Sequence, residues 1–143
     1  MKEVGSPYCK CLYYSSNALA RVMTKMAEAC FESCGLSPSY AFVVMTVNKN
    51  PGLHTGELAE MMMLTPSTIT RLLEKLEARE LVKRVKEGRN TLVFPTRSSV
   101  ELNERILLGW QELYKRIAAS TLSEDAERLT AGIYQAAVSL SGK

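Results

Sequence analysis

The chain has 143 residues, of which 46% are hydrophobic, so it is long enough for one domain with a substantial core. Residues 1–11 contain no apolar run of the kind a signal peptide has, and no stretch reaches the roughly eighteen apolar residues of a membrane span. We therefore expect a soluble, cytoplasmic protein with no membrane partner. The net charge of +3 alone says little about partners.

The distribution of this charge is more informative. Residues 65–90 contain seven basic and four acidic side chains, a balance of +3, whereas the other 117 residues contain eleven of each. A protein surface that faces phosphate groups needs such a local excess of positive charge. A helix face in contact only with solvent is the alternative that charge by itself leaves open.

The first predicted element is a long helix from about Pro7 to Cys34, with Ser6 as its cap and Gly35 at its end. Small and apolar side chains recur every three or four positions along it: Cys9, Leu12, Ser16, Leu19, Met23, Met26 and Cys30. This spacing is typical of a helix that packs lengthwise against another helix.

Three helices are predicted next. The first begins at Ser37 and Pro38 and ends at the turn of residues 48–52. A short helix follows from Thr55 to about Met62, with Thr55 as its cap. The third begins at Thr65, a cap followed by proline, and places four apolar residues on one face: Ile69, Leu72, Leu73 and Leu76.

A hairpin and two more helices complete the chain. Residues 81–86 and 91–94 read as strands joined around "EGRN" (87–90), whose glycine suits a tight turn. Helices are then predicted from about Arg97 to Ser120 and from Ser123 to about Leu140. The fold class is mainly α with a small β-hairpin wing, that is, a winged helix-turn-helix with long N- and C-terminal helices.

The spacing within the helix-turn-helix supports this assignment. Such a unit needs a small residue in its first helix, a residue suited to a tight turn four positions on, and a β-branched residue about ten positions on; Ala59, Met63 and Ile69 occupy these places. Methionine departs from the usual glycine, and would cost on the order of 1 kcal/mol if the turn uses a positive φ.

In a helix-turn-helix the second helix enters the major groove of DNA with its N-terminal residues leading. We expect Arg71 and Thr70 to contact bases, Ser67 and Thr68 to contact bases or phosphates, and Lys75 to contact phosphate. Basic side chains of the hairpin are further candidates for DNA contact, namely Arg84, Lys86 and Arg89. Arg89 at the tip is placed to enter a narrow minor groove.

The segment "NPGLHTGELAEMMMLTPSTITRLLEKLEARELVKRV" (50–85) resembles the MarR family of transcriptional regulators, and the likeness extends over nearly the whole chain. It departs from the family pattern in the wing, where Gly88 replaces an arginine, Pro95 replaces a leucine, and the hairpin is about three residues shorter. The resemblance implies a single domain over 1–143, with a DNA-binding lobe at about 37–96 and dimerisation helices at about 7–34 and 97–141.

The resemblance also implies how such a protein works. A homodimer would bind a pseudo-palindromic operator in double-stranded DNA, acting as a repressor, with half-sites about 34–36 Å apart. A small aromatic or phenolic effector, or oxidation of cysteine, would release it. No cofactor is expected.

The four cysteines allow more than one interpretation. The segment "CKCLYYSSNALARVMTK" (9–25) resembles the first helix of the organic-hydroperoxide-sensing OhrR branch, in which a reactive cysteine precedes a tyrosine by four residues, as Cys9 precedes Tyr13. The resemblance implies redox sensing by Cys9, with Cys11 or a cysteine of the partner as the resolving thiol. The alternatives are cysteines that serve only as small apolar residues or, less favoured by the helical spacing, a zinc site between subunits.

Two other classes of function are alternatives to a DNA-binding regulator. A winged-helix protein–protein adaptor would have the same fold without DNA binding, but the basic segment 65–90 disfavours it. An enzyme such as a thiol peroxidase would need a nucleophile–base arrangement, and the sequence contains no such pattern, no phosphate-binding loop and no paired carboxylates. We therefore predict that the protein is not an enzyme.

Overall fold

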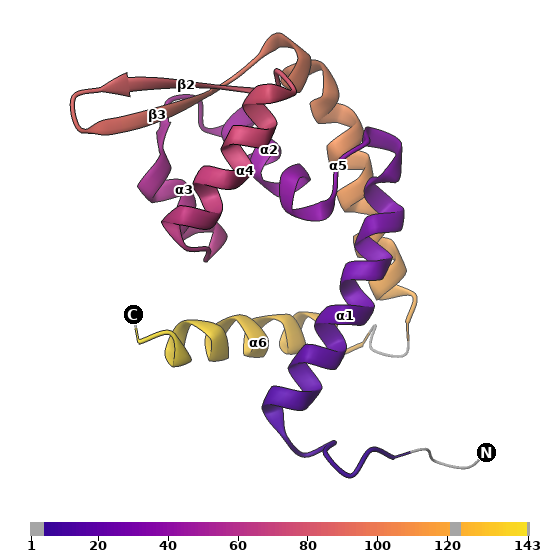
Figure 1. Ribbon diagram of the computed structural model, residues 1–143. Helices are drawn as coiled ribbons and strands as arrows, with labels where there is room; N and C mark the ends of the chain where they lie inside the picture. Colours follow the sequence, from indigo (N-terminus) through magenta and orange to yellow (C-terminus); the bar gives the residue numbers. More distant parts are fainter. Residues whose placement is uncertain (1–4, 121–123, 143) are drawn as a thin grey trace.

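The computed structural model describes residues 5–120 and 124–142. Helices α1 (Leu12–Phe31), α2 (Pro38–Lys49), α3 (Thr55–Met62), α4 (Pro66–Ala78), α5 (Arg97–Ala118) and α6 (Ala126–Leu140) are joined by a 3₁₀ turn, η1 (Glu32–Cys34), and by strands β1 (Leu53–His54), β2 (Val82–Glu87) and β3 (Asn90–Pro95). Figure 1 shows α2–α4 and the hairpin gathered into one lobe, with α1 and α5 leading away from it. The predicted winged helix-turn-helix is confirmed.

The wing is a three-stranded antiparallel sheet in the order β1-β3-β2. The hairpin was predicted, whereas β1 was not, because two residues are too few to show an alternating pattern. Leu53 pairs with Val93 and His54 with Leu92, and the Gly52 N–H donates to the Val93 carbonyl at 2.8 Å. One side of β3 is therefore fixed to the body of the lobe, while the far end of the hairpin projects beyond it (Figure 1).

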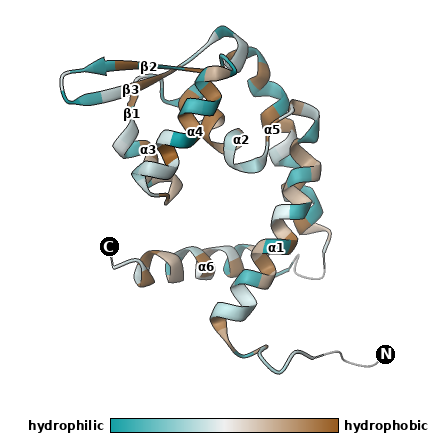
Figure 2. Cartoon of the chain, in the orientation of Figure 1, coloured by the Kyte–Doolittle hydropathy of each residue, from teal (hydrophilic) through white to brown (hydrophobic). Residues whose placement is uncertain are grey.

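We call residues 38–95 the head. Its core lies between α2, α3, α4 and β3, where apolar side chains are excluded from solvent: Val43, Val44, Val47, Leu58, Ile69, Leu73, Leu76 and Val93. Phe31 from α1 and Ile106 from α5 close this core from the side. Figure 2 shows hydrophobic residues on the inner sides of these helices.

A hydrogen-bond network joins the start of α5 to the head. Thr96 caps α5 by accepting from the Ser99 N–H, and its own hydroxyl donates to the Glu80 carbonyl at 2.6 Å. Ser99, which is fully buried, donates to the Asn48 side chain, and Asn48 in turn donates to Asn103. Because the buried Ser99 hydroxyl and the half-buried Asn48 amide both have partners, the network can fix α5 against α2 at little desolvation cost.

Helices α1 and α5 cross closely at Gly109. A β-carbon placed on this residue would lie 2.8 Å from the Cys30 carbonyl oxygen and 2.9 Å from Cδ1 of Phe31. Only glycine lets the two backbones approach in this way. The α1–α5 pair is thereby continuous with the core through Phe31.

Helix α6 extends away from the α1–α5 pair beneath the head (Figure 1) and has no buried residue in the protomer. It nevertheless exposes large apolar side chains, at Leu129, Ile133, Tyr134 and Leu140. The exposed surfaces of α1 and α5 carry others, including Leu12, Val22, Leu108 and Tyr114.

Several predicted boundaries are wrong. The first helix begins at Leu12, not Pro7: residues 7–10 form turns in which the Cys9 N–H donates to Ser6 and the Cys11 N–H to Tyr8, and Cys11 is extended. Thr55 is the first residue of α3 rather than its cap, a position that His54 takes. The predicted start of the last helix at Ser123 lies outside the described residues.

In the described ranges 5–120 and 124–142, no helix is both long and apolar enough to cross a membrane.

Candidate nucleic-acid interface

Helix α4 forms because its sequence supplies both a start signal and an apolar face. The Thr65 side chain accepts from the Thr68 N–H at 3.3 Å, and Pro66 occupies the first turn. Ile69 and Leu73 are each 1% exposed, so this face is fixed in the core. The opposite face is therefore presented to solvent.

The solvent face of α4 carries four of the five predicted recognition residues. Ser67, Thr70, Arg71 and Lys75 are all exposed. The Thr70 hydroxyl donates to the Pro66 carbonyl at 3.0 Å, which leaves its oxygen free to accept a further hydrogen bond. Arg71 and Lys75 lie one helical turn apart and extend this surface along the helix.

Thr68 differs from its neighbours, because it is half-buried. Its hydroxyl lies 2.8 Å from the Thr65 hydroxyl, inside the cap of the helix. Thr68 is therefore less accessible than the other predicted recognition residues, and its hydroxyl takes part in the cap.

The turn between α3 and α4 has the predicted helix-turn-helix geometry. Ala59 (4% exposed) and Ile69 lie in the tight contact between the two helices. Met63 has φ 53° in the left-handed region, and the Leu64 N–H donates to the Ala59 carbonyl at 3.0 Å. Methionine thus takes the strained conformation that glycine would take at lower cost.

The wing places basic side chains on the same lobe as α4. Glu87 pairs with Asn90, so that Gly88 (φ 62°) and Arg89 form a two-residue turn at the tip, which is shorter than the connection over residues 87–90 that was predicted. Lys83, Lys86 and Arg89 are exposed. A positive hairpin and a positive helix face therefore belong to one rigid unit.

Arg84 is the exception among the predicted DNA contacts. Its guanidinium lies 3.0 Å from Oε1 of Glu77, and its backbone N–H donates to Oε2 of the same carboxylate at 2.9 Å. These bonds hold the pKa of Glu77 below its ordinary value, the guanidinium contributing most and the backbone bond next. This role of Glu77 was not identified from the sequence. The signal for it is weak: Glu77 precedes Arg84 by seven positions, and the end of α4 lies between them.

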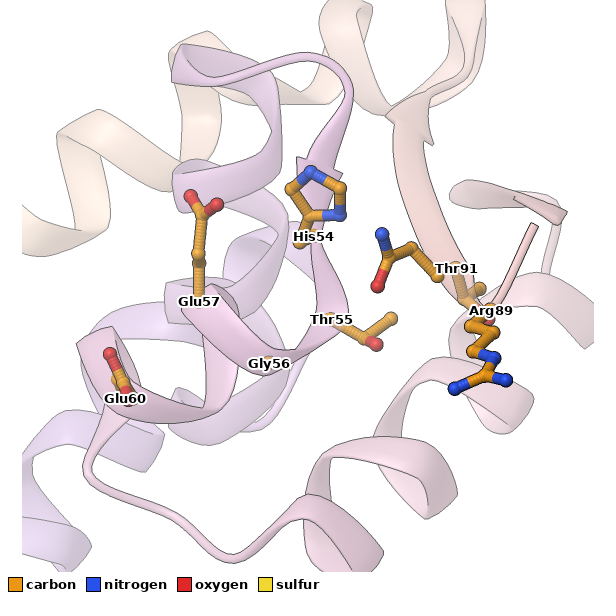
Figure 3. A pocket seen from close by; sticks show the side chains of 8 residues that line it. His54, Thr55, Gly56, Glu57, Glu60, Arg89 and Thr91 are labelled. Carbon is orange, nitrogen blue, oxygen red and sulfur yellow. The ribbon is translucent and has the colours of Figure 1, made fainter. Parts of the chain in front are cut away.

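A shallow hollow of about 380 Å³ lies between the tip of the wing and the start of α3. His54, Thr55, Glu57 and Glu60 line it from one side, and Arg89 and its strand neighbours from the other (Figure 3). His54 lies in β1 and is half-buried.

The cysteines fall into two pairs. Cys9 and Cys11 are exposed, whereas Cys30 and Cys34 are buried. Because α1 begins at Leu12, Cys9 lies outside the helix that contains Tyr13. Their four-residue spacing therefore does not place the two side chains on one helical turn. Within residues 5–120 and 124–142, no three His, Cys, Asp or Glu side chains group as metal ligands would.

Comparison with known proteins agrees with this geometry. A family model described as "MarR family" matches residues 35–90, which include nearly all of the head. The HTH-type transcriptional repressor MdtR of Bacillus subtilis (strain 168) is 27% identical over 123 residues, which cover 82% of this chain and 79% of that protein.

Solved structures share the whole fold. The PcaV transcriptional regulator from Streptomyces coelicolor, in complex with its natural ligand, matches with a TM-score of 0.82 at 19% identity, over 93% of this chain and 96% of that one. A MepR–DNA complex from S. aureus matches with a TM-score of 0.77 at 20% identity, over 90% and 97% of the two chains. The matched family model and the relative MdtR are those of transcriptional regulators rather than enzymes, in agreement with the prediction. The chain is thus similar to the MarR family over residues 35–90 and shares its overall fold with the solved regulators.

Proposed function

We propose that the protein is a sequence-specific DNA-binding transcriptional regulator, acting as a repressor in the cytoplasm. The observation that carries this proposal is the solvent face of α4, where Arg71 and Lys75 stand beside exposed hydroxyls on the lobe that also bears the basic wing. The similarity of the chain to the repressor MdtR and to MepR, a protein solved in complex with DNA, supports the same function.

Each residue has a distinct role in this proposal. Arg71 and Thr70 contact base edges in the major groove, where an arginine can make a bidentate contact with guanine. Ser67 and Lys75 contact phosphates, and Thr68 holds the cap that positions them. Lys86 and Arg89 reach the neighbouring minor groove from the wing.

The protein would act as a homodimer. Helix α6 buries nothing within the protomer, yet Ile133 and Leu140 are 46% and 78% exposed. Apolar side chains aligned on a helix with no partner are stabilised when a second chain covers them. Helices α1, α5 and α6 would form this interface, and two heads related by two-fold symmetry would read a pseudo-palindromic operator.

A small ligand would release the DNA by changing the separation of the two heads. Binding between the dimerisation helices and the head would favour one head spacing over another, and a shift of a few ångströms would misplace one recognition helix. An aromatic or phenolic effector is proposed here, because the family resemblance implies one and the similar regulator PcaV is solved with a ligand.

Oxidation is the alternative trigger. Cys9 and Cys11 are the exposed thiols among the described residues, so an oxidant would reach them before Cys30 or Cys34. Treating the protein with an organic hydroperoxide and measuring DNA binding tests this trigger. Unchanged binding would leave ligand release as the mechanism.

DNA binding itself is tested by selecting duplexes from genomic fragments with the purified protein and measuring affinity as salt is varied. We expect affinity to fall steeply with salt, by a slope of about 0.9 per phosphate contacted. Arg71→Ala should weaken binding about 10- to 100-fold. Arg105→Ala, which removes an exposed arginine of α5 outside the head, is the matched control and should change little. A protein that binds no duplex would instead be a protein–protein adaptor.

A further inference from the structure

The wing has an attachment to the recognition helix that DNA contact does not explain. Glu77 lies in the last turn of α4 and Arg84 in the first half of β2. Both carboxylate oxygens of Glu77 bind the same residue, one through the guanidinium at 3.0 Å and one through the backbone N–H at 2.9 Å. Two bonds to two different parts of Arg84 fix the strand in position as well as in orientation.

The backbone bond is the more informative of the two. Strand β2 is an edge strand, because the sheet order is β1-β3-β2. The N–H groups that face outward from an edge strand need partners outside the sheet. Glu77 supplies such a partner for Arg84. The recognition helix α4 therefore satisfies an N–H group that a neighbouring strand would otherwise bind.

The position of this bond along the hairpin is also specific. Arg84 is paired with Val93, the buried residue at which β3 is joined to β1. The wing is thus held at one level from both sides, by β1 on one edge and by Glu77 on the other. Strand β1 continues for one more pair, His54 with Leu92, and beyond that pair the two strands extend to Arg89 without a third strand beside them.

The Arg84–Val93 pair can therefore act as a pivot, about which the far end of the hairpin would rotate. Arg89 at the tip lies five positions beyond Arg84, a length of about 17 Å in a β-strand. A rotation of about 10° at the pivot would therefore move the tip by roughly 3 Å. A displacement of that size would remove a side chain from hydrogen-bond distance of DNA.

The charge of Arg84 fits the same interpretation. Its side chain is 27% exposed, whereas the Arg97 side chain on α5, which is also in an ion pair, is 93% exposed. To bind a phosphate, Arg84 would have to leave Glu77 and deprive that carboxylate of its partner. Lys83, Lys86 and Arg89 are exposed and are the basic wing residues better placed for that purpose.

We propose that Glu77 and Arg84 are positioning residues, which set the wing relative to the recognition helix so that both enter their grooves together. Arg84 thus acts on DNA recognition through the wing. This inference rests on the proposed DNA-binding function, but its structural part concerns the free protein.

The first measurement needs no DNA. Amide hydrogen exchange in residues 85–92 should quicken severalfold in Glu77→Gln, because the wing is then held on one side only. Glu74→Gln removes the same charge from an exposed position on the same helix and should leave this exchange unchanged. Equal exchange in the wing of Glu77→Gln and of the unsubstituted protein would overturn the proposal.

The second measurement uses a duplex selected by the unsubstituted protein. Removing a negative charge near DNA should by itself strengthen binding, as expected for Glu74→Gln. If the wing is misplaced, Glu77→Gln should instead weaken binding about tenfold, and Arg89→Ala should cost far less in the Glu77→Gln background than alone. Thermal unfolding of each variant checks that it is folded.

These results separate the two proposals. Binding of Glu77→Gln as tight as that of Glu74→Gln, or an equal cost of Arg89→Ala in both backgrounds, would refute the positioning role. Failure of the unsubstituted protein to bind any duplex would refute the proposed function, while the exchange experiment would still decide whether the wing is fixed by Glu77.

Discussion

Helices α4 and α6 are similar in length, with 13 and 15 residues, and both carry apolar side chains on one face. Helix α4 buries Ile69, Leu73 and Leu76 within its own chain, whereas α6 buries nothing. An apolar helix face is therefore buried in one region of the chain and exposed in another. In the head this apolar face is covered by the same chain, and on α6 it is left exposed.

This difference separates two sources of stability. The head should keep its geometry whatever the concentration of protein, because its core is complete. In the proposed homodimer, the arrangement of the two heads should depend on assembly, because α1, α5 and α6 have exposed apolar side chains. Substitutions in the two regions should consequently differ in their dependence on protein concentration.

The largest effect on stability is expected in the head. Ile69→Ala removes a side chain that is 1% exposed between α3 and α4, and should lower the free energy of unfolding by about 2–5 kcal/mol. Urea unfolding at low and high protein concentration measures it. The difference from the unsubstituted protein should be the same at both; a cost below about 1 kcal/mol would mean that this core is not close-packed.

The C-terminal helix is expected to respond through assembly. Ile133→Asp places a charge on the apolar face of α6 and should convert a dimer of twice 15.9 kDa into a monomer, as measured by light scattering. The affinity for a two-site operator should fall about 100-fold, because the second head is no longer held near its half-site.

Gln135→Asp provides the matched control for this change. It introduces the same charge at an exposed polar position of the same helix, and should leave the dimer intact. An unsubstituted protein that is monomeric at micromolar concentration would remove the basis of the comparison.

Two helical glycines provide a finer test. Gly109→Ala should destabilise the protein by about 1–3 kcal/mol, because the new methyl group meets the Cys30 carbonyl and the Phe31 ring. Gly132→Ala in α6 meets nothing within 4 Å and should stabilise the helix by about 0.5–1 kcal/mol. Thermal unfolding measures both. Equal effects would show that the α1–α5 crossing is looser than its geometry indicates.

The helix-turn-helix turn gives a smaller effect. Met63→Gly should raise the free energy of unfolding by up to about 1 kcal/mol, because φ 53° costs methionine more than glycine. Denaturant unfolding measures this change. A loss of stability would show that the Met63 side chain, which is 46% exposed, contributes more by packing than its backbone costs.

The head could be predicted from sequence because its signals are local. Thr65 and Pro66 mark the start of α4, the spacing from Ile69 marks its buried face, and the position of Met63 indicated a strained turn. Each of these signals depends on residues within one or two turns of each other.

The errors come from interactions that are not local. Pro7 suits the first turn of a helix, but the chain forms separate turns and becomes helical only at Leu12. Strand β1 exists because β3 pairs with it, not because of its own residues. Arg84 resembles any other basic residue of the wing until the fold brings Glu77 against it.

The smallest expected effect is the dependence of this ion pair on pH. The guanidinium of Arg84 lowers the pKa of Glu77 below 4.5, so the folded state favours the charged carboxylate. The pair therefore contributes stability above that value and loses it as the pH falls through the lowered pKa. Because the Glu77 side chain is 39% exposed, the contribution should be below about 1 kcal/mol.

Unfolding measured from pH 7 to pH 3 tests this dependence. At neutral pH Glu77→Gln should have a lower free energy of unfolding than the unsubstituted protein, and this deficit should disappear in acid, where the protonated carboxyl resembles the amide. Glu74→Gln should show no such trend, and a deficit for Glu77→Gln that persists unchanged in acid would assign it to the shape of the side chain rather than to its charge.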